Sequence, residues 1–183
     1  MTKTSVAAAC LALVGGCIEF GGPLTNEGGD ELAAGSETTG TDTEEDRCGP
    51  STAVVETVID GDTVILESGE RVRYILVDTP EITGDKNECW GQQAYQYNAM
   101  LVLKQTVSLA YDVECEDQYG RLLAYVSVGD LEVNRELLEA GQACFLHIPP
   151  DGDGKALEYE ALETAAKQAD LGMWGACATI NCD

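Results

Sequence analysis

Three acids and one arginine fall close together in the first half of the chain: Asp62, Arg73, Asp78 and Glu81. Carboxylate oxygens, with a backbone carbonyl or two, are the ligands that a hard cation such as calcium prefers. An arginine beside metal-binding acids indicates an anionic substrate, because its planar guanidinium matches phosphate oxygens. Pro80 fixes the turn that carries Glu81, so this carboxylate is held just beyond a metal ligand, where it can deprotonate water.

The elements that must position these side chains are short strands. Val, Thr and Ile enrichment and turn signals predict strands at 53–59, 63–67, 71–77, 107–113 and 122–128. Helices are predicted at 92–105, at 134–140 with Asn134 as its cap, and at 155–170. This order favours an α+β fold with a mainly β core, in which a small barrel carries helices.

The spacing of Arg73 and Asp78 conflicts with a regular strand. The two residues are an odd number of positions apart, and a flat strand places such residues on opposite faces. They converge only if the strand bends or twists at the barrel rim.

Three motifs occur in a fixed order: Asp60-Gly61-Asp62-Thr63, then Arg73 with Val77-Asp78-Thr79-Pro80-Glu81, then Asp117-Gln118-Tyr119-Gly120-Arg121. Together they closely resemble the thermonuclease (staphylococcal nuclease-like) family, and the resemblance covers about residues 52–174. It implies a five-stranded OB-type barrel with three helices, a fold that often binds nucleic acids on one face.

The resemblance also implies roles for individual residues. Calcium would be held by Asp62, Asp78 and the backbone carbonyl of Thr79, with water and substrate phosphate completing its ligands. Glu81 would act as the general base for water. The remaining roles concern phosphate: Arg73 and Arg121 would stabilise the transition state, and Tyr119 would contact the substrate.

The function implied is that of an exported, monomeric endonuclease. It would hydrolyse phosphodiester bonds in single-stranded or loosened DNA and RNA and leave 3′-phosphate ends. The alternative is a non-catalytic nucleic-acid or protein binding module on the same barrel. Such modules usually lose the acids or the arginines, whereas this chain keeps Asp62, Arg73, Asp78, Glu81 and Arg121.

The charge of the chain argues against a polyanionic partner. Acids outnumber bases by 33 to 10, which gives a net charge of −23. Setting aside the nine acids and two bases before Cys48, the rest carries 24 acids and 8 bases, a net charge of −16. Phosphate contacts dominate nucleic-acid affinity. Either the acids lie away from the cleft, or substrate capture depends on divalent ions and salt.

The N-terminal residues have the pattern of an export signal. A short apolar run follows Lys3, and residues 1–16 are typical of a signal peptide. Small residues directly before Cys17 indicate a lipoprotein processing site, with Cys17 lipidated and anchored to the cell envelope; the alternative is simple secretion. Residues 17–47, rich in Gly, Thr and acids, are predicted to form a flexible tether. The folded domain is predicted at 48–183.

Six cysteines remain in the predicted domain: Cys48, Cys89, Cys115, Cys144, Cys177 and Cys182. An even number in an exported domain indicates three disulfides, and sequence alone cannot choose among the 15 pairings. A zinc site is the weaker alternative, because the chain has a single histidine and no Cys-x-x-Cys.

The anchor hypothesis predicts an acylated protein that fractionates with membranes. Replacing Cys17 by Ser should release or mislocalise the chain, because serine cannot be lipidated at that position. Fractionation of wild type and variant, each detected by immunoblot, measures this. A wild-type chain that is fully soluble after export would contradict the hypothesis.

Overall fold

The computed structural model describes residues 48–84 and 86–182. The predicted signal peptide at 1–16, the lipidation site Cys17 and the tether at 17–47 lie outside the described residues. Within the described part of the chain, no helix is both long and apolar enough to cross a membrane.

Five strands form a closed barrel: β1 (Thr52–Val58), β2 (Thr63–Leu66), β3 (Arg71–Tyr74), β5 (Thr106–Ala110) and β6 (Leu122–Val128). They pair antiparallel in the order β3-β2-β1-β5-β6, and a parallel pairing of β3 with β6 closes the barrel. Four fully buried valines from four strands fill its interior: Val55, Val64, Val72 and Val107. The predicted fold class, an α+β chain with a five-stranded OB-type barrel, is confirmed.

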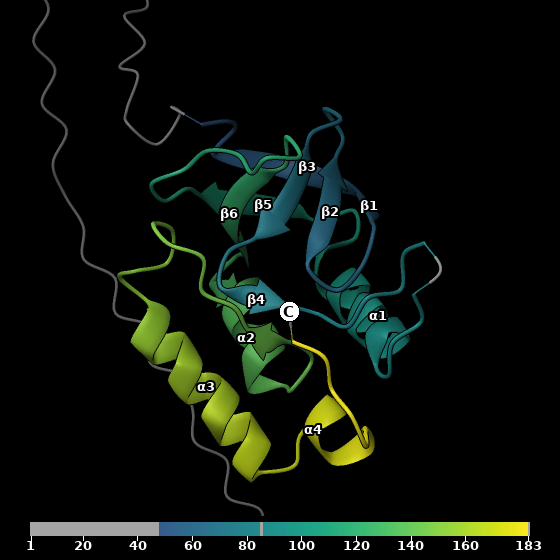
Figure 1. The fold of residues 1–183 in the computed structure, drawn as a ribbon. Coiled ribbons are helices and arrows are strands. Elements are labelled where there is room, and N and C mark those ends of the chain that lie inside the picture. The colour runs from purple at the N-terminus through teal and green to yellow at the C-terminus, as the bar shows by residue number, and fades with distance from the viewer. Residues whose placement is uncertain (1–47, 85, 183) are drawn as a thin grey trace, which may run out of the picture. The chain divides into compact units, whose positions relative to one another are not determined.

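The three predicted helices are present as α1 (Gly91–Val102), α2 (Val133–Glu139) and α3 (Ala156–Gln168). A one-turn helix, α4 (Met173–Ala176), follows them. Short strands complete the fold: β7 (Leu131–Glu132) pairs with β6, and β4 (Val77–Asp78) pairs with β8 (Cys144–Phe145). Figure 1 shows the barrel at one end of this domain, α2, α3 and α4 at the other, and β4 between them.

The predicted single strand at 71–77 is wrong, because the chain bends at Ile75 and Leu76. Leu76 has a φ of 65°, a left-handed conformation that is rare for a bulky side chain. Burial holds it there: Leu76 is 3% exposed, and its carbonyl accepts a hydrogen bond from the Leu146 N–H at 3.2 Å. A Cβ on Gly152 would lie 2.3 Å from the Leu76 side chain, so only glycine permits this packing.

Asn134 does not cap α2, as the sequence suggested; Glu132 is the cap residue and Asn134 lies inside the helix. Its fully buried side chain accepts a hydrogen bond from the Val126 N–H at 2.9 Å. Its amide donates to the Ile75 carbonyl at 2.9 Å and to the Ala124 carbonyl at 3.2 Å. The buried environment therefore uses Asn134 to join α2, β6 and the bend.

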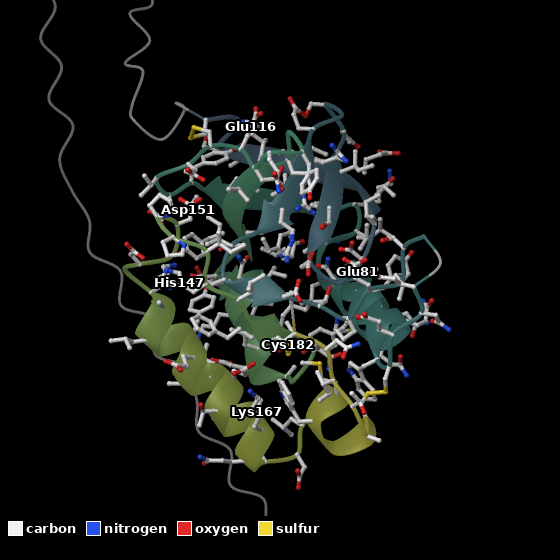
Figure 2. The ribbon with its side chains drawn as sticks, in the orientation of Figure 1. Glu81, Glu116, His147, Asp151, Lys167 and Cys182 are labelled. Atoms are coloured by element: carbon white, nitrogen blue, oxygen red, sulfur yellow. A yellow bond between two sulfur atoms is a disulfide. The ribbon has the colours of Figure 1, made fainter. Side chains whose placement is uncertain are left out.

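The six cysteines form three disulfides, Cys48–Cys115, Cys89–Cys177 and Cys144–Cys182. Two of them join the end of the chain to distant elements: Cys177 to the residue two before α1, and Cys182 to β8. Figure 2 draws these bonds in yellow and labels Cys182. The third, Cys48–Cys115, ties the start of the domain to the segment that leads into β6.

Replacing Asn134 by Ala should destabilise the domain by about 3 kcal/mol, because it removes the acceptor for the buried Val126 N–H, the donor to the Ile75 carbonyl and one of the two donors to the Ala124 carbonyl. Chemical denaturation followed by circular dichroism measures the change in free energy of unfolding. Asn87→Ala, at an exposed position, is the matched control and should stay within about 0.5 kcal/mol of wild type. Equal stability of the two variants would contradict this role for Asn134.

Candidate active site

Asp62 joins the turn between β1 and β2 to the segment after β4. One carboxylate oxygen, Oδ2, accepts hydrogen bonds from the Thr79 N–H at 2.7 Å and from the Thr79 hydroxyl at 2.8 Å. Asp62 and Thr79 are 5% and 4% exposed. A Cβ on Gly61 would lie 2.6 Å from Thr79 side-chain atoms, so glycine is required for this close approach. Two predicted metal-site residues, Asp62 and Thr79, are thus in direct contact.

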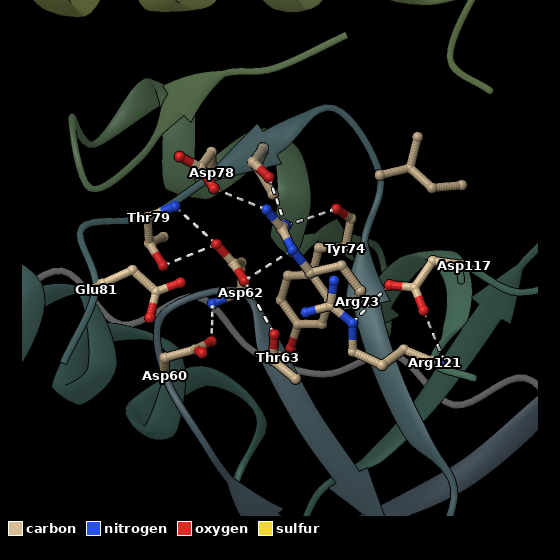
Figure 3. Close-up of polar contacts among 12 residues, drawn as sticks. Asp60, Asp62, Thr63, Arg73, Tyr74, Asp78, Thr79, Glu81, Asp117 and Arg121 are labelled. Carbon is tan, nitrogen blue, oxygen red and sulfur yellow. Dashed lines mark hydrogen bonds and ion pairs between the residues drawn. The ribbon is translucent and has the colours of Figure 1, made fainter. Parts of the chain in front are cut away.

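Arg73 lies between two of the predicted metal-binding acids. Its Nε is 3.2 Å from Asp62 Oδ1, and its Nη2 is 2.9 Å from Asp78 Oδ1. Its Nη1 donates to the carbonyls of Tyr74 at 3.0 Å and Val77 at 2.5 Å. Figure 3 shows the guanidinium between the two carboxylates. The bend after Tyr74 resolves the odd spacing, because it turns Asp78 back toward the face that carries Arg73.

Asp60 is an acid of this site to which the sequence interpretation gave no role. It is 8% exposed, its Oδ1 accepts the Asp62 N–H at 3.1 Å, and its carbonyl accepts from the buried Asn98 amide at 3.2 Å. Burial, and next the negative charge of Asp62, raise the pKa of Asp60 to about 7. The signal in the sequence was a second acid two positions before Asp62.

The donor set of this site fits a hard cation. The carboxylates of Asp62 and Asp78 would supply oxygen ligands, as calcium and magnesium prefer, and the Asp60 carboxylate lies beside them. Burial raises the pKa of Asp60 first and the negative charge of Asp62 raises it further, and a bound cation would relieve this repulsion between the two acids. In this structure Arg73 supplies the positive charge next to Asp62 and Asp78.

Glu81 lies at the edge of this group, on the loop that leads to α1. Its Oε2 accepts a hydrogen bond from the Thr83 hydroxyl at 2.8 Å. Figure 3 shows its carboxylate directed toward Asp60 and Asp62, and its charge contributes to the raised pKa of Asp60. Glu81 is partly exposed, whereas Asp62 is buried. A water molecule can therefore reach the carboxylate that the sequence predicts to be the base.

Arg121 and Arg73 line the same cleft, which has a volume of about 600 Å³. The Arg121 side-chain Nε contacts Asp117 Oδ2 at 2.6 Å. The backbone N–H of Arg121 donates to Asp117 Oδ1 at 3.0 Å. Asp117 also accepts the Tyr119 N–H at 2.9 Å. The turn from Asp117 to Arg121 is therefore built around one carboxylate, a residue whose positioning role the sequence interpretation missed.

Tyr119 is 65% exposed and lines the cleft, so it does not pack into the barrel. Its ring centroid lies 5.5 Å from the Arg121 guanidinium carbon, within cation–π distance. Its carbonyl accepts a hydrogen bond from Arg71 at 2.7 Å. The predicted substrate-contacting residue is thus accessible beside a predicted catalytic arginine.

The acids of the domain do not all lie away from this cleft. Four of them line it together with the two arginines: Glu114, Glu116, Asp117 and Asp151. Asp151 is buried, and its Oδ1 accepts the N–H groups of Val113 and Glu114 at 2.8 and 2.9 Å. The sequence left open the explanation that the acids lie away from the cleft, and that explanation is wrong for these four side chains.

Comparison with known proteins gives a consistent family. The model of the family described as staphylococcal nuclease homologue matches residues 71–176. The thermonuclease of Staphylococcus intermedius is 38% identical over 126 residues, which cover 66% of this chain and 74% of that protein. Endonuclease YncB of Bacillus subtilis is 35% identical over 127 residues, covering 66% of this chain and 60% of its own length.

A second thermonuclease, from Staphylococcus hyicus, is 36% identical over 118 residues, covering 61% of this chain and 67% of that protein. The family model covers more than half of the 183 residues. Together with the barrel and the site described above, these matches show that this chain belongs to the staphylococcal nuclease family.

Proposed function

We propose that this chain is a calcium-dependent endonuclease that hydrolyses phosphodiester bonds in DNA, RNA or both and leaves 3′-phosphate ends. Membership of the family makes the chain a nuclease. The observation that supports the finer proposal is the convergence of Arg73 on two buried or half-buried carboxylates, with Arg121 on the same cleft.

The acids around Arg73 have the chemistry to hold the metal. Asp62 and Asp78, with the Thr79 carbonyl, would supply its protein ligands, and Asp60 adds negative charge beside them. When bound, calcium polarises a phosphate oxygen and neutralises charge that develops during the reaction. The hydrogen bonds from Thr79 hold the Asp62 carboxylate in one orientation, so this ligand is preorganised for a cation.

The chain's own residues perform the remaining chemistry. Glu81 takes a proton from a water molecule, whose oxygen forms a new bond to phosphorus. The bond between phosphorus and the 5′-oxygen breaks as the new bond forms. The 5′-oxygen takes a proton from solvent water as it leaves, and Glu81 returns its own proton to solvent. Arg73 and Arg121 donate hydrogen bonds to the phosphate oxygens as negative charge grows on them. Tyr119 contacts the substrate at the cleft mouth, where its exposed ring lies beside Arg121.

The competing hypothesis is a non-catalytic nucleic-acid or protein binding module on the same barrel, and such modules usually lose the acids or the arginines. In the structure Arg73 contacts Asp62 and Asp78, and Asp117 orients Arg121. A module that only bound nucleic acid would have no use for the carboxylates of Asp60, Asp62 and Asp78, because they repel phosphate. This arrangement favours the enzyme.

We also propose that the chain is exported, lipidated at Cys17 and monomeric, acting on single-stranded or loosened DNA and RNA at the cell envelope. The pattern of residues 1–17 supports export. The three disulfides support an oxidising compartment, because such bonds rarely persist in the cytosol.

Three variants separate the roles within the site. Asp78→Asn should lower the affinity for calcium, so that added calcium partly restores activity. Glu81→Gln should cost about 10²–10⁴-fold in turnover, because it removes a positioned base, and calcium should not restore it. Arg121→Ala should behave like Glu81→Gln, because charge stabilisation at phosphorus matters most in the transition state. Cleavage rates of single-stranded DNA and RNA measured against calcium concentration, with a chelator control, check these outcomes.

The wild-type chain is the reference in that experiment. Should Glu81→Gln and Arg121→Ala both keep near-wild-type turnover at saturating calcium, this site is not the catalytic one. An inert wild type would favour the binding module.

The acidic cleft predicts an unusual response to salt. A domain with a net charge of −16 repels a polyanion, and the Debye length shortens from roughly 30 Å at 0.01 M to about 8 Å at physiological ionic strength. Activity at fixed calcium should therefore stay level or rise between low and moderate salt, against the usual loss from counterion release. Initial cleavage rates along a NaCl series measure this. A steep, monotonic decrease would show that local basic contacts dominate.

A further inference from the structure

We propose that the Cys89–Cys177 disulfide is a positioning element for Glu81, fixing the loop that carries this carboxylate to the end of the domain. The inference rests on the catalytic role proposed above for Glu81. It concerns residues 81–84 and 86–91 and the contacts of Cys89 and Trp90 with the segment after α4 and with the turn after α2.

The loop that begins at Glu81 is closed by two reciprocal hydrogen bonds. The Glu88 N–H donates to the Glu81 carbonyl at 2.9 Å, and the Glu81 N–H donates to Glu88 Oε2 at 2.9 Å. Between them, the Lys86 N–H donates to the Thr83 carbonyl at 3.3 Å. The backbone of Glu81 is therefore held chiefly by Glu88, a residue that itself lies on the loop.

The closed loop is fixed to the rest of the molecule immediately after Glu88. Cys89 is bonded to Cys177, with Cα atoms 6.0 Å apart. The Trp90 indole N–H donates to Gln142 Oε1 at 2.8 Å. A Cβ on Gly91 would lie 2.8 Å from the Pro80 carbonyl and 3.1 Å from that of Glu81, so the start of α1 packs directly on the backbone of the base.

The other end of the disulfide is equally well anchored. The Cys177 N–H donates to the Met173 carbonyl at 2.9 Å, and the Met173 N–H donates to the Gly141 carbonyl at 2.9 Å. Met173 is fully buried. A Cβ on Gly172 would lie 2.2 Å from the Gly141 carbonyl oxygen, so α4 is seated tightly on the end of α2.

These contacts join the loop to the turn after α2 by two separate routes. Cys89 leads through the disulfide to Met173 and Gly141, and Trp90 returns to Gln142, the next residue after Gly141. Cys89 itself is exposed, so hydrophobic burial does little to hold its position. The covalent bond therefore adds, one residue from Glu88, a constraint that burial of Cys89 does not supply, beside the contacts of Trp90 and Gly91. A catalytic side chain must be held within about 0.5 Å of its productive position, and the contacts that support its backbone determine whether it is.

The test compares two variants of the full chain, each of which lacks one of the three disulfides. Cys89→Ser/Cys177→Ser removes the proposed positioning bond, and Cys48→Ser/Cys115→Ser removes a bond of similar sequence separation, 67 residues against 88. Figure 2 shows a yellow bond close to Glu116, at the end of the barrel remote from Cys182. Thermal melts and circular dichroism establish that both variants are folded at the assay temperature.

The first variant should lose about 10–100-fold in kcat with KM for single-stranded DNA changed less than about threefold, because misplacing a catalytic group affects chemistry more than binding. The control should lose less in kcat than the first variant while its melting temperature falls by a similar amount. Because Cys115 lies two residues before Asp117, which orients Arg121, the double-mutant cycle below decides whether the loss in the first variant acts through Glu81. A loss confined to KM would show a purely structural role and overturn the inference.

A double-mutant cycle makes the assignment specific. If the disulfide acts through Glu81, adding Cys89→Ser/Cys177→Ser to a Glu81→Gln chain should change kcat by less than about twofold. A full additive loss would overturn the inference while leaving the role of Glu81 intact. A Glu81→Gln chain with wild-type turnover would instead contradict the proposed function, and this inference with it.

Glu88 provides an independent test in which every disulfide is retained. Glu88→Ala removes the acceptor for the Glu81 N–H, and it should lower kcat with little change in melting temperature. Glu88→Gln keeps an acceptor oxygen and should retain more of kcat than Glu88→Ala does. If the two variants have equal kcat, the hydrogen-bonded loop does not position Glu81, and the inference fails even where the cysteine variants cannot be folded.

Discussion

The double ion pair of Arg73 with Asp62 and Asp78 is the interaction on which the site depends. Arg73 lies in β3, Asp62 lies in the turn that precedes β2, and Asp78 lies in β4, so the two ion pairs join three separate elements of the fold. Removing either carboxylate from water carries a desolvation penalty. The guanidinium of Arg73, which has five N–H donors, lies between the two carboxylates and offsets that penalty. The same guanidinium binds two carbonyls of the bend, so the ion pairs and the backbone conformation support each other.

The bend itself shows how remote parts of the fold determine the geometry of the site. Leu76 adopts a conformation that costs on the order of 1 kcal/mol or more for a non-glycine residue. Buried contacts from three places keep it there: Asn134 of α2 at the preceding carbonyl, Leu146 after β8, and Gly152 before α3. One helix and the segment between β8 and α3, all outside the barrel, thus decide which way a carboxylate at its rim points.

The electrostatics of the domain separate substrate approach from substrate turnover. The net charge is strongly negative, and acids line even the cleft that holds Arg73 and Arg121. Such a field slows the encounter with a polyanion at low ionic strength. Close to the site, however, the two arginines and the proposed cation would set the local potential, since charges a few ångströms away outweigh screened distant ones. Acidic surface and phosphodiester chemistry are therefore compatible.

The sequence by itself determined the barrel class and the three main helices, and it predicted most of the residues of the candidate site. Turn and strand signals are local, and the residues Asp62, Arg73, Asp78, Thr79, Glu81, Tyr119 and Arg121 belong to short motifs that survive any uncertainty in element boundaries. It did not determine the break between β3 and β4, the buried role of Asn134 or the pairing of the six cysteines. Each of these depends on groups far apart in the chain, which meet only when the core forms. Burial then outweighs local preference: it stabilises a left-handed Leu76, turns a residue expected to cap a helix into a bridge between elements, and brings Cys89 next to Cys177.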